Sequence, residues 1–412
     1  MYTQNDNQNR VAVVGGGAAG LFATAILLEH GVDVTLFEHM PRTGTKLLIT
    51  GKGRCNVTNN CTPEEVLNNV VTNPRFLYSA LSSLTPQDVM TFFEGHGVPL
   101  KTERGQRVFP VSDQSQDIVN ALRQAVKGAT LVKERVTALL LDGTTIQGVR
   151  AGCDYAFDKV LLATGGVSYP KTGSDGSGYT LAQQAGHTIV APTPSLVPLT
   201  SPDGICREMQ GLSLRNVGLT VKVGGKKLYE DFGEMLFTHF GVSGPMVLSA
   251  SARMKGVDFG DTVLQIDLKP ALDEKALDAR LLSDFAKNAN RDFINELGCL
   301  LPQKMLLPFA QKVGIDPHKK VHDITKEERR RILTTLKAFT IRVNGFRPIE
   351  EAIITSGGVS CKEVNPKTMM SKLVEGLYFA GEILDVDAYT GGFNLQIAFS
   401  TAHLAAKAMA GI

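Results

Sequence analysis

Three glycines and one acidic residue near the N-terminus have the types and spacing of a dinucleotide site. The glycines follow the pattern Gly15-x-Gly17-x-x-Gly20 directly after a short apolar run. In this pattern Gly15 permits a tight turn, Gly17 lets the backbone approach a pyrophosphate, and Gly20 lets a helix pack closely on a strand. Glu38 ends the next apolar run, where its carboxylate can accept ribose hydroxyls. The helix that starts here would offer unpaired N–H groups to the phosphates.

The segment 51–58 holds a second set of residues suited to a phosphate-bearing ligand. Gly51 and Gly53 free the backbone, and Arg54 supplies a forked cation that matches phosphate geometry. Asn56 and Thr58 supply hydrogen bonds. We therefore expect this segment to lie against the dinucleotide.

Two later segments favour FAD over NAD as the dinucleotide. The apolar run in 160–166 leads into Thr-Gly-Gly, where the chain can pass close to the ligand. In the segment 377–396, an apolar run ends at Glu382, whose carboxylate could hold a ribityl hydroxyl. Gly391 and Gly392 then precede a helical pattern, so a helix N-terminus would stabilise negative charge on reduced flavin.

The elements that position these residues begin with a strand–helix–strand unit. Residues 11–14 form a short apolar run typical of a buried strand, and 18–30 have a helical pattern that Gly31 would end. A second apolar run covers 32–37. Short apolar strands that flank a helix predict a parallel sheet and an α/β fold.

The middle of the chain has a different pattern from its two ends. Prolines cluster at 192–198, and strand-like alternation at 219–223 is followed by helical patterns at 271–297 and 324–339. The nucleotide-domain pattern returns after Gly345. We therefore expect an FAD-binding domain in two segments, 1–195 and 345–412, and an inserted substrate or cap domain at 196–344.

Composition narrows the classes of protein that remain. The chain has 412 residues with 43% hydrophobic and 20% charged residues, which fits a globular protein of more than one domain. Its net charge of +2 argues against a surface built wholly for nucleic acid. The basic residues at 319–320 and 329–331 alternate with acidic ones, as on a solvated helix face. We expect no nucleic-acid partner and no membrane association.

The six cysteines are scattered, with no zinc-ligand spacing, and no metal site is expected. Reduced structural thiols indicate a cytoplasmic protein. For Cys55, a buried small residue is a better interpretation than a redox thiol.

The sequence resembles a bacterial family of FAD-dependent oxidoreductases described as aminoacetone-oxidase-like, within the glutathione-reductase-like flavoproteins. The segments that carry the resemblance are VAVVGGGAAGL at 11–21, KLLITGKGRCNVTN at 46–59, ATGGVSYPKTGSDGSGY at 163–179, FTHFGVSGP at 237–245, TSGGV at 355–359 and LYFAGEILDVDAYTGGFNLQ at 377–396. The resemblance implies a two-piece FAD domain whose insert has a β-barrel-like part and a helical part. It also implies that the backbone of Val136 holds the adenine.

The motifs and the resemblance together define the expected contacts to the cofactor. They are Gly15, Gly17, Ala18, Ala19, Gly20, Glu38, Lys46, Gly53, Arg54, Asn56, Val57, Thr58, Val136, Thr164, Gly165, Gly381, Glu382, Asp385, Gly392, Asn394, Leu395 and Gln396. Tyr169 and His239 lie in two of the motifs and are candidate proton donors, although packing roles explain them at least as well.

These observations predict an FAD-dependent oxidoreductase that transfers a hydride between the flavin and an unidentified small molecule. NADH and NADPH are open choices of reductant. A dehydrogenase that uses NAD(P) without flavin is one alternative, but it leaves 377–396 without a role. Two others are a flavoprotein in which FAD is mainly structural and a flavin-dependent RNA-modifying protein.

Overall fold

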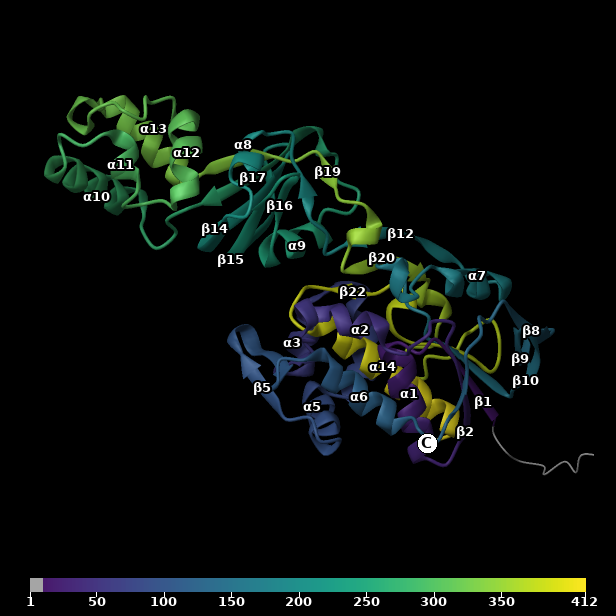
Figure 1. The fold of residues 1–412 in the computed structure, drawn as a ribbon. Coiled ribbons are helices and arrows are strands. Elements are labelled where there is room, and N and C mark those ends of the chain that lie inside the picture. The colour runs from purple at the N-terminus through teal and green to yellow at the C-terminus, as the bar shows by residue number, and fades with distance from the viewer. Residues whose placement is uncertain (1–9) are drawn as a thin grey trace, which may run out of the picture. The chain divides into compact units, whose positions relative to one another are not determined.

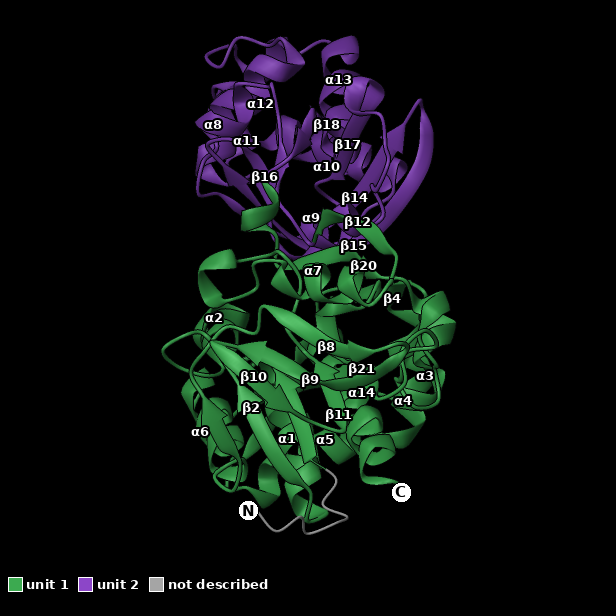
Figure 2. Cartoon of the chain, turned by 90° about the vertical axis from the view of Figure 1, so that its right-hand side faces the viewer, with its two compact units in different colours: residues 1–195, 348–412 green, residues 196–347 purple. Residues whose placement is uncertain are grey.

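The chain forms two compact units, each with its own hydrophobic core. The computed structural model describes residues 10–412, of which 10–195 and 348–412 form unit 1 and 196–347 form unit 2 (Figure 2). The return to unit 1 falls after Arg347, slightly later than the expected boundary at Gly345. The physical reason is strand β19 (Gly345–Phe346), whose residues pair with Leu199 and Thr200 of unit 2.

Unit 1 is built on a five-stranded parallel sheet in the order β21-β11-β1-β2-β7. Its strands are β1 (Arg10–Val14), β2 (Asp33–Phe37), β7 (Thr130–Val132), β11 (Lys159–Leu162) and β21 (Leu377–Phe379). The last strand comes from the C-terminal segment, so both pieces of the chain are needed to complete the sheet.

Helix α1 (Ala18–Glu29) follows β1 and is buried from Ala19 to Leu27. Its apolar and small residues lie on every side, which suits a helix enclosed between other elements. It packs against α14 (Phe393–Ala410), the last helix of the chain (Figure 1). Gly31 follows the helix with a φ of +73°, a conformation that stops a helix and favours glycine.

The rest of unit 1 consists of short elements around this core. The helices are α2 (Thr45–Ile49), α3 (Pro63–Asn68), α4 (Tyr78–Ser83), α5 (Pro86–Gly95), α6 (Ser115–Ala125) and α7 (Ser177–Gln184). The strands are β3 (Thr58–Asn59), β4 (Val70–Thr72), β5 (Leu100–Glu103), β6 (Arg107–Pro110), β8 (Ala138–Asp142), β9 (Thr145–Ala151), β10 (Cys153–Ala156), β12 (Ile189–Ser195), β20 (Ile354–Val359) and β22 (Asp387–Ala388). Strands β12 and β20 are antiparallel neighbours, and they lie next to the two points where the chain leaves and re-enters unit 1.

Unit 2 contains a seven-stranded antiparallel sheet in the order β18-β17-β14-β15-β16-β13-β19. Its strands are β13 (Leu199–Thr200), β14 (Ser213–Val223), β15 (Lys226–Thr238), β16 (Gly241–Ser243), β17 (Thr262–Asp267), β18 (Phe339–Arg342) and β19. Only Val343 and Asn344 separate the two edge strands β18 and β19, so the sheet must curl until its edges approach. This matches the β-barrel-like part expected of the insert.

The helices of unit 2 are α8 (Ile205–Glu208), α9 (Pro245–Ala252), α10 (Glu274–Lys287), α11 (Phe293–Leu297), α12 (Leu306–Val313) and α13 (Lys326–Lys337). The last four of these follow β17 and form the helical part (Figure 1). Among residues 10–412, no helix has the length and apolar character needed to cross a membrane.

Candidate functional site

The glycine turn between β1 and α1 shows which glycines the fold needs and which it leaves to a ligand. At Gly15, with a φ of +105°, a Cβ would lie 2.5 Å from the carbonyl oxygen of Ala163. At Gly20 a Cβ would lie 1.8 Å from the carbonyl oxygen of Gly15. At Gly17, the N-cap of α1, a Cβ would meet nothing within 4 Å, and no side chain caps the helix. The first N–H groups of α1 are therefore free to bind an anion.

Glu38 is fixed to this turn by two backbone hydrogen bonds. Its Oε2 accepts from the N–H of Gly16 at 2.8 Å, and its Oε1 accepts from the N–H of Met40 at 2.7 Å. Each carboxylate oxygen keeps a second lone pair, with which it can accept a ribose hydroxyl. The structure thus places Glu38 beside the turn, as the sequence predicts.

Two buried polar atoms near these elements have no hydrogen-bond partner within residues 10–412. They are Oγ1 of Thr164, just after β11, and Oδ1 of Asn56. Buried polar groups are nearly always paired, since desolvation without a partner is costly. A bound molecule with hydroxyl or N–H groups would satisfy both atoms. Together with the free helix N-terminus and Glu38, they fit an FAD molecule.

The loop that contains Asn56 is held in an unusual conformation. Gly51, Lys52, Gly53 and Cys55 all have a φ between +57° and +85°, which costs energy for the two residues that are not glycine. Such strain often accompanies a ligand-binding loop. Burial raises the pKa of the Cys55 thiol to about 12, which suits packing rather than redox chemistry.

A cluster of charged and polar groups joins both chain segments of unit 1. The Lys46 ammonium on α2 lies 2.6 Å from Glu382 Oε2 and donates to Ser168 Oγ at 2.8 Å. Ser168 Oγ donates to Glu382 Oε1 at 2.9 Å, and the N–H of Thr355 donates to the same oxygen at 2.8 Å. The Lys46 and Glu382 side chains are only 20% and 21% exposed. A positive charge is therefore fixed beside the motifs 163–179 and 377–396.

This cluster changes the role expected of Glu382. Protein donors already engage both of its carboxylate oxygens, so its partners here are Lys46, Ser168 and Thr355 rather than a ribityl hydroxyl. Ser168 and Thr355 were not among the contacts expected from the sequence, although both lie within the motifs 163–179 and 355–359.

Arg54 also has partners other than those expected. Its guanidinium binds the carboxylates of Glu103 and Asp113 and lies 4.1 Å from the ring centroid of Phe109. These contacts use the forked donors that were expected to bind phosphate. The sequence pattern at 51–58 could not indicate these partners, because the two acids lie 49 and 59 residues further along the chain.

The start of helix α14 is held in place by side chains that were expected to contact the cofactor. Gly392 caps the helix with a φ of +100°, and a Cβ there would lie 2.3 Å from the carbonyl oxygen of Thr58. Asn394 exchanges two hydrogen bonds with the backbone of Ala388, at 2.9 and 2.8 Å. Gln396 Oε1 accepts from Thr58 Oγ1 at 2.6 Å. The Gly392 backbone and the side chains of Asn394 and Gln396 position the helix, and the first N–H groups of α14 remain available to a ligand.

The remaining expected contacts fall into three groups. The first group lies at the carboxyl ends of the parallel strands, as does the turn at 15–20, and consists of Ala18, Ala19, Gly165 and Gly381. Ligands bind at this edge of such sheets. Lys46, Gly53 and Val57 lie in or beside the α2 loop, and Val136 is buried between β7 and β8. Asp385 is buried and accepts from Asn73 at 3.0 Å, and Leu395 lies in the first turn of α14.

The two candidate proton donors lie in different units. Tyr169 belongs to unit 1, is half-buried and has a φ of +52°. Burial, and then the charge of Glu351, raises the pKa of its hydroxyl. His239 belongs to unit 2, where it is exposed in the turn between β15 and β16. Across residues 10–412, no group of three or more His, Cys, Asp and Glu side chains could hold a metal ion.

The fold and the site define a class: this chain is a Rossmann-type flavoprotein oxidoreductase. It belongs to the HI0933-like family, because residues 9–408 match the family described as HI0933-like protein Rossmann domain. The narrower aminoacetone-oxidase-like description stays a prediction.

Comparisons with individual proteins agree with this family. The chain is 31% identical over 403 residues to the ribosomal RNA dihydrouridine synthase of Escherichia coli, and the matched region covers 96% of each chain. It is 29% identical over 411 residues to the 3-dehydro-bile acid delta(4,6)-reductase of Clostridium scindens, over 98% of this chain and 99% of the other. A crystal structure of 3-ketosteroid delta1-dehydrogenase from Sterolibacterium denitrificans, in complex with 1,4-androstadiene-3,17-dione, shares the fold. Its TM-score is 0.52 at 13% identity, over 98% of this chain and 100% of that one.

Proposed function

We propose that this protein uses FAD to reduce a carbon–carbon double bond that is conjugated with a carbonyl group. The observation that carries the proposal is the Lys46–Glu382 pair, which fixes an ammonium group among the segments expected to hold the flavin. Addition of a hydride to such a bond builds negative charge on the carbonyl oxygen. The Lys46 ammonium has three N–H donors, of which Glu382 and Ser168 engage two, and the third would donate to that oxygen and so lower the barrier.

The chain's own residues would hold the cofactor and exclude water from it. The N-terminus of α1 and Glu38 would bind the pyrophosphate and the adenosine ribose, and Thr164 and Asn56 would pair with polar groups of the flavin half. Val136 would hold the adenine through its backbone, as the family resemblance implies. Reduced FAD, when bound, supplies the hydride.

Tyr169 is the strongest candidate in unit 1 for the proton that completes the reduction. A tyrosine hydroxyl is protonated near neutral pH, as a proton donor requires, and burial raises the pKa of this one. Its left-handed backbone is strained for a residue other than glycine, and such strain is often found at functional sites. In unit 2, the exposed His239 remains a second candidate.

The two curated relatives support a reductase and suggest different substrates. The name of the first describes the formation of dihydrouridine, a uridine whose conjugated ring double bond has been reduced, and the name of the second describes the reduction of double bonds in a bile acid. Both reactions need the chemistry proposed here. A small unsaturated carbonyl compound is the first candidate substrate. A uridine in RNA is the second, favoured by the 31% identity over nearly the whole chain.

The test is anaerobic reoxidation of the flavin. The protein is reduced with dithionite and mixed with an unsaturated ketosteroid, a uridine-containing RNA, or the saturated analogue of each, while flavin absorbance is followed. We expect absorbance to return only with an unsaturated compound. If neither unsaturated compound reoxidises the flavin but an amine reduces the oxidised protein, the reaction is an oxidation and the proposal fails. Reduction by NADH or NADPH, measured in the same cell, identifies the donor.

A further inference from the structure

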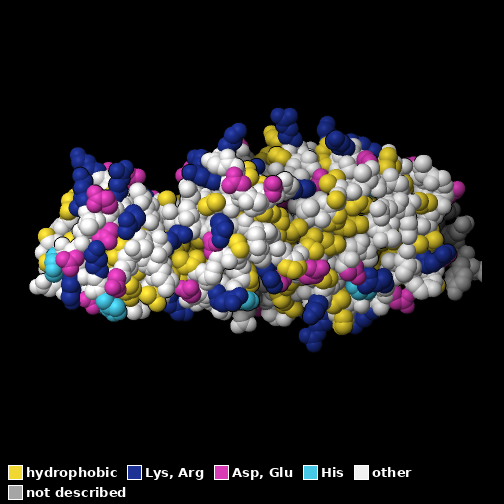
Figure 3. All heavy atoms as spheres, turned by 90° about the horizontal axis from the view of Figure 1, so that it is seen from above, with side chains coloured by type: hydrophobic (Ala, Val, Ile, Leu, Met, Phe, Trp, Pro, Cys, Tyr) yellow, Lys and Arg dark blue, Asp and Glu magenta, His cyan; other side chains and the backbone are white. Residues whose placement is uncertain are grey.

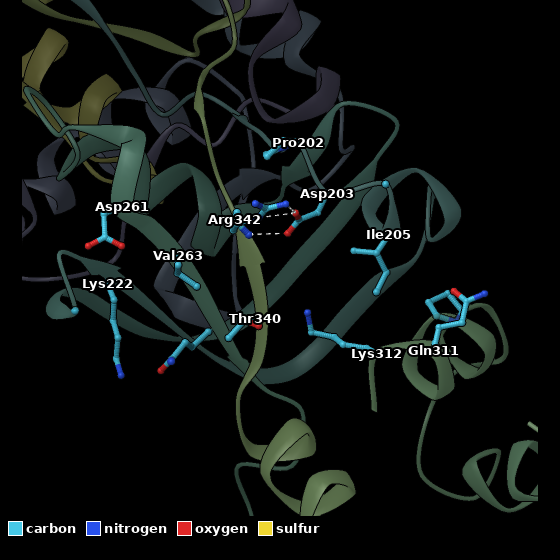
Figure 4. A pocket seen from close by; sticks show the side chains of 14 residues that line it. Pro202, Asp203, Ile205, Lys222, Asp261, Val263, Gln311, Lys312, Thr340 and Arg342 are labelled. Atoms are coloured by element: carbon cyan, nitrogen blue, oxygen red, sulfur yellow. Dashed lines mark hydrogen bonds and ion pairs between the residues drawn. The ribbon is translucent and has the colours of Figure 1, made fainter. Parts of the chain in front are cut away.

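A groove on unit 2 is lined by none of the residues that the proposed reaction uses. It has a volume of about 890 Å³ and is formed by three parts of the unit (Figure 4). Its floor is the outer face of strands β14, β17 and β18. One wall is α12, and another comes from the segment 202–205 at the start of α8.

The floor places two cations in one cross-strand row. Lys222 pairs with Val263 on the next strand, and Val263 pairs with Arg342 on the strand after that. Neighbouring strands lie about 4.8 Å apart, so the Cα atoms of Lys222 and Arg342 are roughly 10 Å from each other. The alternate residues of these strands, including Leu264 and Ile341, point into the hydrophobic core. The row therefore belongs to the outer face.

A third cation enters from the helical wall. Lys312 on α12 lies with its ammonium 5.1 Å from the ring centroid of Phe339, and Figure 4 shows it on the opposite side of the groove from Lys222. Among residues 10–412, neither Lys222 nor Lys312 has a carboxylate oxygen within 4 Å of its ammonium, although the charge of Asp203 also acts on Lys312. Arg342 binds Asp203 through Nε at 2.9 Å and through a terminal nitrogen at 2.7 Å, which neutralises that carboxylate. Asp261 is the other acid of the lining.

The other lining groups also suit an anionic polymer. Gln265, Gln311 and Thr340 can donate hydrogen bonds to phosphate oxygens or to a 2′-hydroxyl. Aromatic side chains, on which bases would stack, are not part of this lining. Cations on both sides of an open groove suit a chain of successive phosphate groups better than they suit one isolated phosphate group. On the face shown in Figure 3, basic and acidic side chains are interspersed, so any such attraction must be local.

We infer that this groove binds the phosphodiester backbone of a single-stranded RNA segment, through Lys222 and Lys312. The inference rests on the second substrate proposed above, a uridine in RNA. Contacts of this kind position a substrate without reading its sequence. The groove would therefore supply affinity, and the choice of uridine would be made by the flavin site.

The test measures binding of a labelled single-stranded RNA of about twelve nucleotides to the flavin-loaded full chain, as a function of salt. The variant Lys222→Gln/Lys312→Gln removes two cations with little change in size. We expect at least about tenfold weaker binding at low salt, and a salt slope smaller by about 0.7 for each lost phosphate contact. Lys275→Gln is the matched control, because Lys275 is exposed on α10 of the same unit and does not line the groove.

Several outcomes would overturn the inference. The inference fails if the wild-type protein binds no RNA or if the double variant binds RNA as tightly as the wild type. It also fails if the control variant loses as much affinity as the double variant. Displacement of the RNA by uridine monophosphate or inorganic phosphate at equal concentration would indicate a site for a single phosphate instead. Flavin content and the unfolding midpoint check the fold of each variant. If neither the unsaturated ketosteroid nor the RNA reoxidises the flavin of the wild-type protein, the proposed reaction is refuted and not the groove.

Discussion

The fold requires a glycine at position 20, whereas at position 17 the expected ligand requires one, and two alanine variants distinguish these requirements. A Cβ at Gly20 would collide with the backbone of Gly15, whereas a Cβ at Gly17 would enter open space. We expect Gly20→Ala to lower the free energy of unfolding of the flavin-free protein by about 1–3 kcal/mol. Gly17→Ala should change it by less than about 1 kcal/mol, yet weaken FAD binding at least about tenfold.

Urea unfolding of the flavin-free protein and flavin titration measure these two effects. Gly186→Ala tests the strain of a left-handed glycine alone, since Gly186 has a φ of +81° and no neighbour within 4 Å of its Cβ position. Normal FAD affinity in Gly17→Ala would mean that the pyrophosphate does not approach this turn.

Lys46 is the residue on which the proposed reaction depends most. Lys46→Met keeps much of the side-chain volume and removes the charge, which leaves the largely buried Glu382 with only Ser168 and Thr355 as donors. We expect turnover to fall about 100-fold or more, because one preorganised electrostatic partner is lost. The free energy of unfolding should fall by about 1–3 kcal/mol.

The measurements are single-turnover flavin reoxidation and urea unfolding, with Lys127→Met as the control. Lys127 is exposed, and its side chain forms no hydrogen bond or ion pair with another side chain of residues 10–412. Unchanged turnover in Lys46→Met, with the expected loss of stability, would assign this pair a purely structural role.

At the scale of elements, one buried carboxylate connects three strands. Asp387 in β22 is fully buried and accepts from Ser195 Oγ of β12 at 2.8 Å and from Ser356 Oγ of β20 at 3.1 Å. Asp387→Ala removes both hydrogen bonds and leaves a gap, so the free energy of unfolding of unit 1 should fall by at least about 1.5–3 kcal/mol. Chemical unfolding followed by flavin fluorescence reports on this unit, and exposed Asp154 supplies a control. An effect no larger than that of Asp154→Ala would show that the serines do not need the charge.

The packing of α14 on α4 predicts a dependence on pH. His403 of α14 contacts Ser83 Oγ of α4 at 3.1 Å, and burial lowers the pKa of its imidazole to about 4. The unfolded chain takes up a proton near pH 6.5, while the folded chain resists it. Stability is therefore present above pH 6.5 and is lost as the pH falls toward 4, by at most about 1.4 kcal/mol per unit. His403→Gln should flatten this part of the stability profile relative to wild type. An unchanged profile would exclude His403 as the cause.

Elements with strong local patterns were predictable from the sequence. Strands β1 and β2, helix α1 and the turn between them follow from apolar runs and glycine spacing, since neighbours in sequence make their contacts. Strand β14 agrees with the alternation of apolar and polar residues at 219–223. The short antiparallel sheet of β8, β9 and β10 was not foreseen, because these strands have only weak alternation.

The side-chain partners within the site were less predictable than its location. Arg54 and Glu382 were selected as residues that bind the cofactor, yet their charges are engaged by protein groups. Those partners come from distant parts of the sequence, and only the folded chain brings them together. Spacing identifies which residue types are present, but it cannot show which of two acceptors a donor will bind.

For the whole molecule, the two units should be separable. Each has its own core, and the chain crosses between them beside the paired strands β12 and β20. We expect a variant in which a short glycine linker joins Ser195 to Pro348 to fold and to bind FAD, because unit 1 contains the fingerprint turn, Glu38 and α14. It should lose substrate turnover, since the insert is expected to be the substrate or cap domain. Flavin occupancy measures the first property, and anaerobic reoxidation of the flavin by substrate measures the second. A folded variant without FAD would make the insert part of the cofactor site.

The order of the strands in unit 1 has a consequence for how the protein folds during translation. Strand β21 and helix α14, which complete the parallel sheet and cover α1, come from the last 36 residues of the sequence. Unit 2 is a continuous stretch that is fully synthesised earlier. During translation the inserted unit can therefore reach its final form while helix α1 still lacks its cover. Helix α1 precedes unit 2 in the chain but finishes folding after it, and the apolar surface of α1 needs protection until α14 emerges.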